Sequence, residues 1–138
     1  MAQSETQDPK INEAVKRCIE CFSTCVKTIS YCLELGGEHA ERELITLLEI
    51  CADICQVSAR AMLLGSSVHA DVCQACATTC LACANVCDSI PDERMQRCAT
   101  VCRQCAEACR QMKPKGRVDV SPGAGVLPGQ GQDLPPTV

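Results

Sequence analysis

The sequence has almost no aromatic residues. Its 138 residues include one Phe, one Tyr and no Trp. Large aromatic side chains normally fill much of a protein core, so smaller groups must fill this one. A chain of this length can form one domain with its own core, and nothing in it suggests a second. The abundant small residues are alanine and cysteine, and cysteine alone occurs fifteen times.

The sequence also lacks the charge patterns that bind nucleic acids or membranes. The net charge is -4 and no Lys/Arg-rich face is present, so we expect neither partner. No segment approaches the length of a transmembrane helix. Residues 1–10 contain neither a hydrophobic signal core nor a twin-arginine motif. The sequence therefore predicts a cytoplasmic location in a bacterium-like cell.

A disulfide scaffold is not expected in such a reducing compartment, and fifteen cysteines cannot all pair within one chain. Cysteine is often a small buried hydrophobic residue, which would explain one or two of them. It does not explain fifteen, because a core of thiols buries fewer carbons than a core of leucine and isoleucine. The cysteine content therefore points to a soft metal ion.

Nine cysteines lie in one short stretch with a regular spacing. Within each of two groups, successive cysteines are three or four residues apart, which places their sulfurs on one face of a helix. The first group is Cys73, Cys76, Cys80, Cys83 and Cys87, and the second is Cys98, Cys102, Cys105 and Cys109.

The pattern predicts four helices. They should cover about 9–35, 38–64, 66–88 and 89–112. Asp8 should cap the first helix, Gly36 and Gly37 should end it, and Gly65 should end the second. Ser66 or Ser67 should cap the third helix, and Ser89 and Pro91 should start the fourth. The first two helices carry the remaining cysteines on the same kind of face: Cys18, Cys21, Cys25, Cys32, Cys51 and Cys55. Short turns between four helices predict an all-α, up-down-up-down antiparallel four-helix bundle with a cysteine-lined core over residues 9–112. A flexible N-terminal lead (1–8) and a Pro/Gly-rich irregular tail (113–138) should flank it.

The first two predicted helices carry a second apolar stripe beside the cysteine face. Its members are Val15, Ile19, Phe22, Val26, Ile29 and Leu33 on the first helix, and Leu47, Ile50, Ile54, Val57, Ala61 and Leu64 on the second. Two stripes exceed what one bundle core requires, so we expect one of them to bury against another subunit. The alternative is that the stripes only seal the first helix against the second.

The helical setting of the cysteines favours Cu(I) over other metals. Structural zinc sites and iron–sulfur clusters usually take cysteines from turns and loops. Cu(I) prefers thiolate and tolerates two or three ligands, which sulfurs one helical turn apart can supply. One monovalent ion per buried thiolate also leaves the core neutral.

Three further residues should meet at one end of the bundle: Met62, His69 and Met112. Thioether and imidazole bind Cu(I) less tightly than thiolate, so these residues could pass ions inward by ligand exchange. Alternatively, the methionines plug the bundle and His69 is a solvated first-turn residue. The opposite end, with Cys32, Cys87 and Met95 near the leucines of the second helix, should be more apolar. His39 lies off the cysteine face and receives no role.

With C-x-x-C-x-x-x-C runs such as Cys73, Cys76 and Cys80 in a four-helix bundle, the chain resembles the bacterial copper storage proteins, in particular their cytosolic branch. This resemblance covers roughly residues 9–112. It implies a tetramer of bundles, each holding many Cu(I) ions along its axis, with uptake at one end. Thr28, Leu48 and Ser58 occupy positions of the cysteine face where further thiols could sit.

We therefore expect a cytosolic Cu(I) storage protein that binds copper through all fifteen cysteines and performs no catalysis. One alternative is a metallothionein-like Zn(II) or Cd(II) buffer with about one ion per four cysteines. Another, a thiol redox or iron–sulfur enzyme, has no supporting motif. Storage and detoxification would use the same site, and the sequence identifies no copper chaperone or acceptor.

Overall fold

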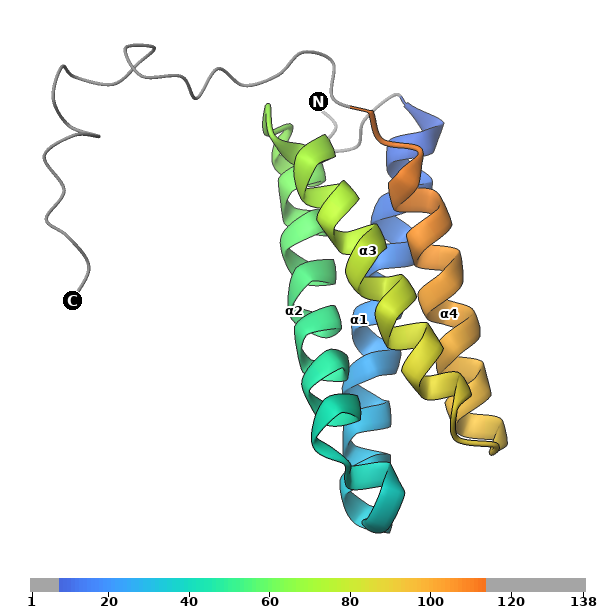
Figure 1. The fold of residues 1–138 in the computed structure, drawn as a ribbon. Helices are drawn as coiled ribbons and strands as arrows, with labels where there is room; N and C mark the ends of the chain where they lie inside the picture. The colour runs from blue at the N-terminus through green and yellow to red at the C-terminus, as the bar shows by residue number, and fades with distance from the viewer. Residues whose placement is uncertain (1–7, 114–138) are drawn as a thin grey trace, which may run out of the picture.

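The computed structural model describes residues 8–113, which form an antiparallel four-helix bundle (Figure 1). The helices are α1 (Pro9–Leu35), α2 (Arg42–Leu64), α3 (His69–Asp88) and α4 (Glu93–Arg110), and a short 3-10 helix, η1 (Gly37–Ala40), connects the first two. This confirms the predicted fold. The segments expected to be a lead and a tail lie almost entirely outside the described residues, so those two boundaries stay predictions.

Each helix packs against two neighbours, α1 against α2 and α4, and α3 against α2 and α4. The start of α1, the end of α2, the start of α3 and the end of α4 share one end of the bundle, at the top of Figure 1. We call this the open end and the other the closed end. This arrangement turns the cysteine faces of all four helices toward one axis.

The bounds of α1 agree with the prediction. The Asp8 side chain accepts a hydrogen bond of 2.9 Å from the backbone N–H of Lys10, and Pro9 occupies the first turn. At the other end Gly36 has a φ of 71° and donates its N–H to the carbonyl of Cys32 at 2.9 Å. Glycine adopts this positive φ without the strain that a side chain would add.

The predicted start of the second helix at residue 38 was wrong. Both Gly36 and Gly37 have positive φ, and the chain then makes the η1 turn before α2 begins at Arg42. Glu41, the residue before α2, is extended and provides no side-chain cap. The turn from α1 into α2 therefore takes more residues than the two glycines alone.

The predicted caps of the third and fourth helices were also wrong. Ser66 and Ser67 do not cap α3, because Ser66 Oγ accepts from the N–H of Val68 inside the turn, at 3.2 Å. Ser89 does not start α4 but donates its hydroxyl to the carbonyl of Val86 at 2.6 Å, which closes the end of α3. The cap of α4 is Asp92, and the helix ends at Arg110, two residues before Met112.

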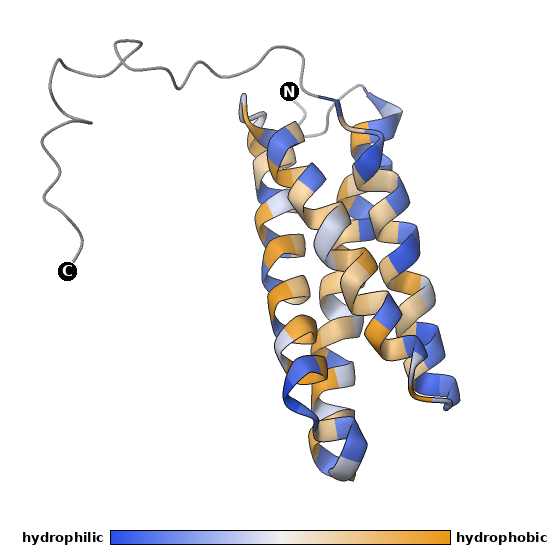
Figure 2. Cartoon of the chain, viewed as in Figure 1, coloured by the Kyte–Doolittle hydropathy of each residue, from blue (hydrophilic) through white to orange (hydrophobic). Residues whose placement is uncertain are grey.

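Cysteine and alanine form most of the core, and polar residues lie outside (Figure 2). Buried alanines such as Ala84, Ala99 and Ala106 flank the cysteines of α3 and α4, and small flanks let helices approach closely. By length and composition alone α3 could cross a membrane, contrary to the expectation that no segment reaches that length. Its cysteines and several alanines are buried against the other helices, so its apolar character is that of a core helix.

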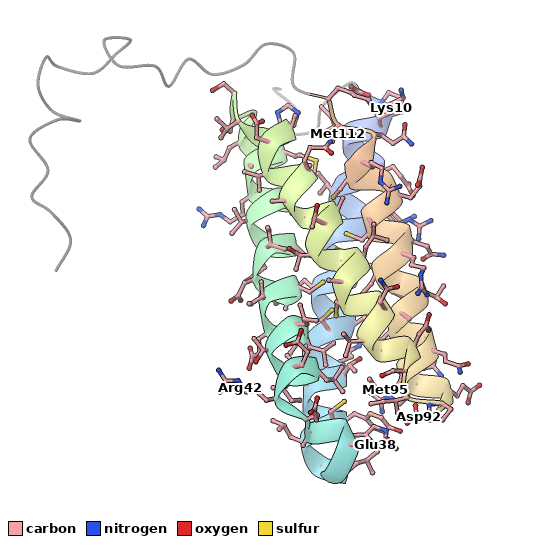
Figure 3. The ribbon with its side chains drawn as sticks, in the orientation of Figure 1. Lys10, Glu38, Arg42, Asp92, Met95 and Met112 are labelled. Atoms are coloured by element: carbon pink, nitrogen blue, oxygen red, sulfur yellow. The ribbon has the colours of Figure 1, made fainter. Side chains whose placement is uncertain are left out.

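Asp92 fastens the closed end. It caps α4 by accepting the N–H of Met95 at 2.8 Å (Figure 3). Its carboxylate also lies 2.6 Å from His39 Nε2 and accepts the hydroxyl of Tyr31 at 2.9 Å. Burial raises the pKa of Asp92, but the bonds from Met95, His39 and Tyr31 outweigh it and leave the pKa below its ordinary value of 3.8. One carboxylate thus joins α1, η1 and α4.

We predict that Asp92→Ala lowers the free energy of unfolding by about 1–2 kcal/mol, the usual loss for a helix cap. Because the pKa of Asp92 is depressed in the folded state, its carboxylate stabilises the fold above the ordinary carboxyl pKa and loses this effect as the pH falls. The difference from wild type should therefore be full at pH 7 and shrink below about pH 4. Urea unfolding at several pH values measures it. Asp53→Ala, at an exposed position of α2, should show no loss.

Candidate metal centre

All fifteen cysteines lie inside the bundle with no solvent exposure, and all are free thiols. Alternating steps of three and four residues keep each helix's sulfurs on its inner face. The thiols meet even across the diagonals of the bundle, where Cys55 Sγ of α2 lies 3.8 Å from Cys105 Sγ of α4. The sulfurs therefore form one column along the axis, which we call the thiol column.

The spacing within the column is close to sulfur–sulfur contact. Cys18 Sγ is 3.5 Å from Cys109 Sγ, and Cys51 Sγ is 3.6 Å from Cys80 Sγ. Further pairs lie at 3.8 or 3.9 Å: Cys21–Cys51, Cys21–Cys102, Cys18–Cys105, Cys25–Cys102, Cys55–Cys76, Cys55–Cys80 and Cys76–Cys80. Two neighbouring sulfurs at these distances could bind one ion between them with little movement of their side chains.

Three groups of four sulfurs each could hold a metal ion, with all sulfurs of a group within 4.8 Å of one another. They are Cys18, Cys76, Cys105 and Cys109; Cys21, Cys55, Cys80 and Cys105; and Cys21, Cys25, Cys51 and Cys102. The groups are not separate, because the first two share Cys105 and the last two share Cys21. The column therefore offers a continuous ladder of ligands rather than isolated sites.

The pKa values of the thiols differ along the column. Burial raises the pKa of Cys32 to about 11, so this thiol is neutral at pH 7 and a metal ion must displace its proton. Hydrogen bonds from neighbouring thiols, chiefly from Cys102, lower the pKa of Cys83 to about 6. Thiolate character is thus available inside the column while much of it stays uncharged.

The structure places Met62, His69 and Met112 at the open end, as expected. Met62 lies in the last turn of α2 and His69 begins α3. Met112 follows α4 (Figure 3). Both methionines are buried, and Gln74 donates to the carbonyl of Met112. His69 Nδ1 lies 2.9 Å from the carbonyl of Ser66. Because a carbonyl only accepts, Nδ1 carries the proton of the neutral ring, which leaves a lone pair on Nε2 for a metal ion.

The closed end is apolar inside, as predicted. Cys32 Sγ lies 3.6 Å from Met95 Sδ, and both side chains are buried together with Leu44 and Leu48 of α2. Outside these buried side chains lie Tyr31, His39 and Asp92, and the Asp92 carboxylate contacts both other residues. We call them the Asp92 trio. The cysteine periodicity could not reveal this trio, because His39 lies on a connecting turn rather than on a cysteine face. An aspartate three residues before the fourth helix's first cysteine-face position, Met95, was the available signal for a cap.

Comparison with known proteins adds independent evidence. A sequence model of the family described as copper storage protein matches residues 7–114. The chain belongs to the copper storage protein family. A curated relative, the uncharacterised cysteine-rich protein YhjQ of Bacillus subtilis (strain 168), is 36% identical over 73 residues, which are 53% of this chain and 68% of YhjQ.

Solved structures of similar proteins share the fold. The crystal structure of the Nmul_A1745 protein from Nitrosospira multiformis is 40% identical, with a TM-score of 0.73 over 77% of this chain and 96% of that one. The Cu(I)-bound copper storage protein BsCsp3 is 34% identical, with a TM-score of 0.71 over 75% and 97%. The apo form of copper storage protein 3 from Bacillus subtilis is 35% identical, with a TM-score of 0.65 over 73% and 96%.

Two hydroxyl residues take positions on the inner face of this copper storage family member. Thr28 donates its hydroxyl to the carbonyl of Thr24 at 2.7 Å. Ser58 is fully buried, and its Oγ has no hydrogen-bond partner among the described residues. A buried hydroxyl without a partner is destabilising, so Ser58 lowers the stability of the metal-free fold.

We predict that Ser58→Ala raises the free energy of unfolding of the metal-free protein by about 1 kcal/mol, because it removes an unpaired buried hydroxyl. Chemical denaturation under reducing conditions measures the change. Thr28→Val is the matched control, since the hydroxyl that it removes has a partner, and it should leave stability unchanged or lower. A loss of stability in Ser58→Ala would contradict the assignment of an unpaired hydroxyl.

Proposed function

We propose that this protein stores Cu(I) ions along the thiol column. The observation that carries the proposal is the overlap of the four-sulfur groups through Cys21 and Cys105. Shared sulfurs suit Cu(I), which accepts two or three thiolates. A zinc ion requires four ligands of its own in a tetrahedron. Membership of the copper storage family and the likeness to Cu(I)-bound BsCsp3 support the same conclusion.

Charge balance favours the same ion. Isolated charge in a buried core is strongly unfavourable, and one Cu(I) per thiolate leaves none. A divalent ion on four thiolates leaves two negative charges in the core. Before metal arrives, protonated thiols are neutral and weakly polar, so the bundle folds without copper. Nothing in this chemistry turns over a substrate, in keeping with a family of storage proteins rather than enzymes.

The ligands that we propose are the cysteines of the column: Cys18, Cys21, Cys25, Cys32, Cys51, Cys55, Cys73, Cys76, Cys80, Cys83, Cys87, Cys98, Cys102, Cys105 and Cys109. Met62, His69 and Met112 at the open end would receive ions and pass them to the first thiolates. The free, buried state of every thiol supports the cytoplasmic location expected from the sequence, because reducing compartments keep thiols unpaired.

We predict that the reduced protein takes up about one Cu(I) per cysteine, on the order of fifteen ions, in an anaerobic titration followed by competition with a Cu(I) chelator. Cys55→Ser, which removes a sulfur within 3.8 Å of three others, should lower this number. Ser58→Cys, one turn along the same face, should raise it by about one.

A plateau at three or four ions would contradict the copper store, because it would mean discrete four-thiolate sites. The same experiment with Zn(II) or Cd(II) would then be expected to saturate at that number, in favour of a metallothionein-like buffer.

For the open end we predict a kinetic effect without a change in capacity. His69→Ala should slow Cu(I) uptake severalfold, because an imidazole ligand is lost where ions are received. Stopped-flow measurement of Cu(I)-thiolate absorbance gives the rate. Ser67→Ala, in the same turn, is the control and should load at the wild-type rate. Equal rates in all three proteins would remove His69 from the uptake route.

We further propose that the protein forms a homo-oligomer, a tetramer as the family resemblance implies. Two rows of exposed apolar residues, one on α1 and one on α2, support this. Ile19, Val26 and Leu33 on α1 follow each other at seven-residue intervals, and each is at least 45% exposed. Ile50, Val57 and Leu64 repeat the interval on α2 and are at least 48% exposed. Figure 2 shows hydrophobic residues along α2. Sealing α1 against α2 does not bury these six, so both rows have the character of an interface. Ile19 borders the groove between α1 and α2, whereas Ile50 and Val57 border the groove between α2 and α3.

We predict that Val57→Glu dissociates the oligomer, because it places a charge in the middle of the exposed apolar row on α2. Light scattering coupled to size-exclusion chromatography measures the mass. Thr100→Glu, at an exposed position of α4, should leave the mass at four chains. A wild-type protein with the mass of one chain would contradict the proposal.

A further inference from the structure

The flank of the bundle carries a cavity that the storage column does not account for. It has a volume of about 220 Å³ and is lined by Thr24, Lys27 and Thr28 of α1 and by Arg94, Arg97 and Cys98 of α4. These two helices are direct neighbours in the bundle (Figure 1). The cavity therefore opens through the side of the bundle between them, away from the open end where Met62, His69 and Met112 lie.

The charged residues around the cavity are all cations. Lys27 and Arg97 are exposed, and neither has an ion-pair partner among residues 8–113. Arg94 lies over the ring of Tyr31, with its guanidinium carbon 4.5 Å from the ring centre. Within residues 8–113 no carboxylate lines the cavity, although the whole chain has a net charge of -4. Unpaired cations gathered around one hollow in an acidic protein attract an anion of small size.

The same cavity borders a residue of the column. Cys98 is the one cysteine among its lining residues, and it lies just beneath the cavity wall with no solvent exposure. Cys98 lies on the inner face of α4, one turn before Cys102, which belongs to a four-sulfur group. Thr28 occupies the facing position of α1 where the cysteine pattern would allow another thiol. An anion held by Lys27 and Arg97 would therefore lie beside Cys98, the residue of the column that lines the cavity.

We propose that this cavity binds a small anionic thiol that carries Cu(I) and transfers the ion sideways to Cys98. The proposal rests on the proposed storage of Cu(I) and adds a second uptake route with a defined class of donor, a thiol with a carboxylate. The volume is below the roughly 300 Å³ at which pockets enclose drug-sized ligands, so it fits a thiol of a few carbons or one end of a larger one.

The transfer is a ligand exchange that balances without an oxidant or reductant. The donor is a Cu(I) ion held by two donor thiolates. A bond forms between Cys98 Sγ and the ion, and the bond from the ion to one donor thiolate breaks. The proton of the Cys98 thiol goes to the departing thiolate, and the copper stays monovalent throughout. Exchange with the second thiolate, by another thiol of the column, completes the transfer.

Two small donors that differ mainly in charge test the proposal. Anaerobic stopped-flow mixing compares the rate of Cu(I) uptake from the 3-mercaptopropionate complex, which is anionic, with that from the 2-mercaptoethanol complex, whose side group is neutral. With wild type, uptake from the anionic donor should be faster and should saturate with donor concentration. In Lys27→Gln/Arg97→Gln the anionic rate should fall about tenfold, in the range of electrostatic effects on association, and the neutral rate should not change.

The matched control is Lys16→Gln/Arg42→Gln, which removes the same charge at exposed residues that do not line the cavity. It should keep the wild-type rates. Equal losses in both double variants would overturn the proposal, because the effect would then be one of net charge. An unchanged anionic rate in Lys27→Gln/Arg97→Gln would overturn it as well.

A third variant tests the receiving sulfur. In Cys98→Ala, uptake from the anionic donor should no longer be faster than uptake from the neutral donor and should no longer saturate with donor concentration. The neutral donor should continue to load the protein through the open end. If uptake from the anionic donor is still the faster in Cys98→Ala, the sideways transfer is overturned. If wild type retains only three or four ions from either donor, the storage function itself fails, and that outcome is distinct from a failure of the side route.

Discussion

The contact between sulfurs of different helices is the constraint on which the rest of this structure depends. Thiols from all four helices must come within about 4 Å of each other for one ion to bridge them. That requirement explains the nearly absent aromatic residues and the buried alanines beside the cysteines, since larger side chains would hold the helices apart. It also explains the antiparallel bundle, in which every helix turns one face to a common axis.

Much of this arrangement could be predicted from the sequence, because a helix face has a fixed period. The burial of all fifteen cysteines follows from steps of three and four, and so does the position of the hydroxyls of Thr28 and Ser58. The ends of helices follow no such period. Ser66 and Ser89 are good caps in isolation, but each bonds within its own turn, and the choice of Asp92 depends on His39 and Tyr31 from distant parts of the chain.

The contacts within the column could not be predicted either. The sequence places sulfurs on faces, whereas the distances between faces depend on how deeply four helices pack together. Only the assembled bundle reveals that Cys21 and Cys105 each belong to two four-sulfur groups. The cavity beside Cys98 is similar, because its cations come from α1 and α4, which are adjacent in space but lie at opposite ends of the sequence.

The ladder of shared sulfurs determines how the copper capacity of such a protein can change. The capacity of a protein with loop-built metal sites grows only by addition of whole motifs. Here one more helical turn lengthens the ladder by about 5.4 Å and brings at most one or two further cysteines from each helix. Capacity is therefore a nearly continuous property of helix length and of single substitutions on the inner face, and a bundle of this kind can be tuned to an organism's copper supply without a new fold.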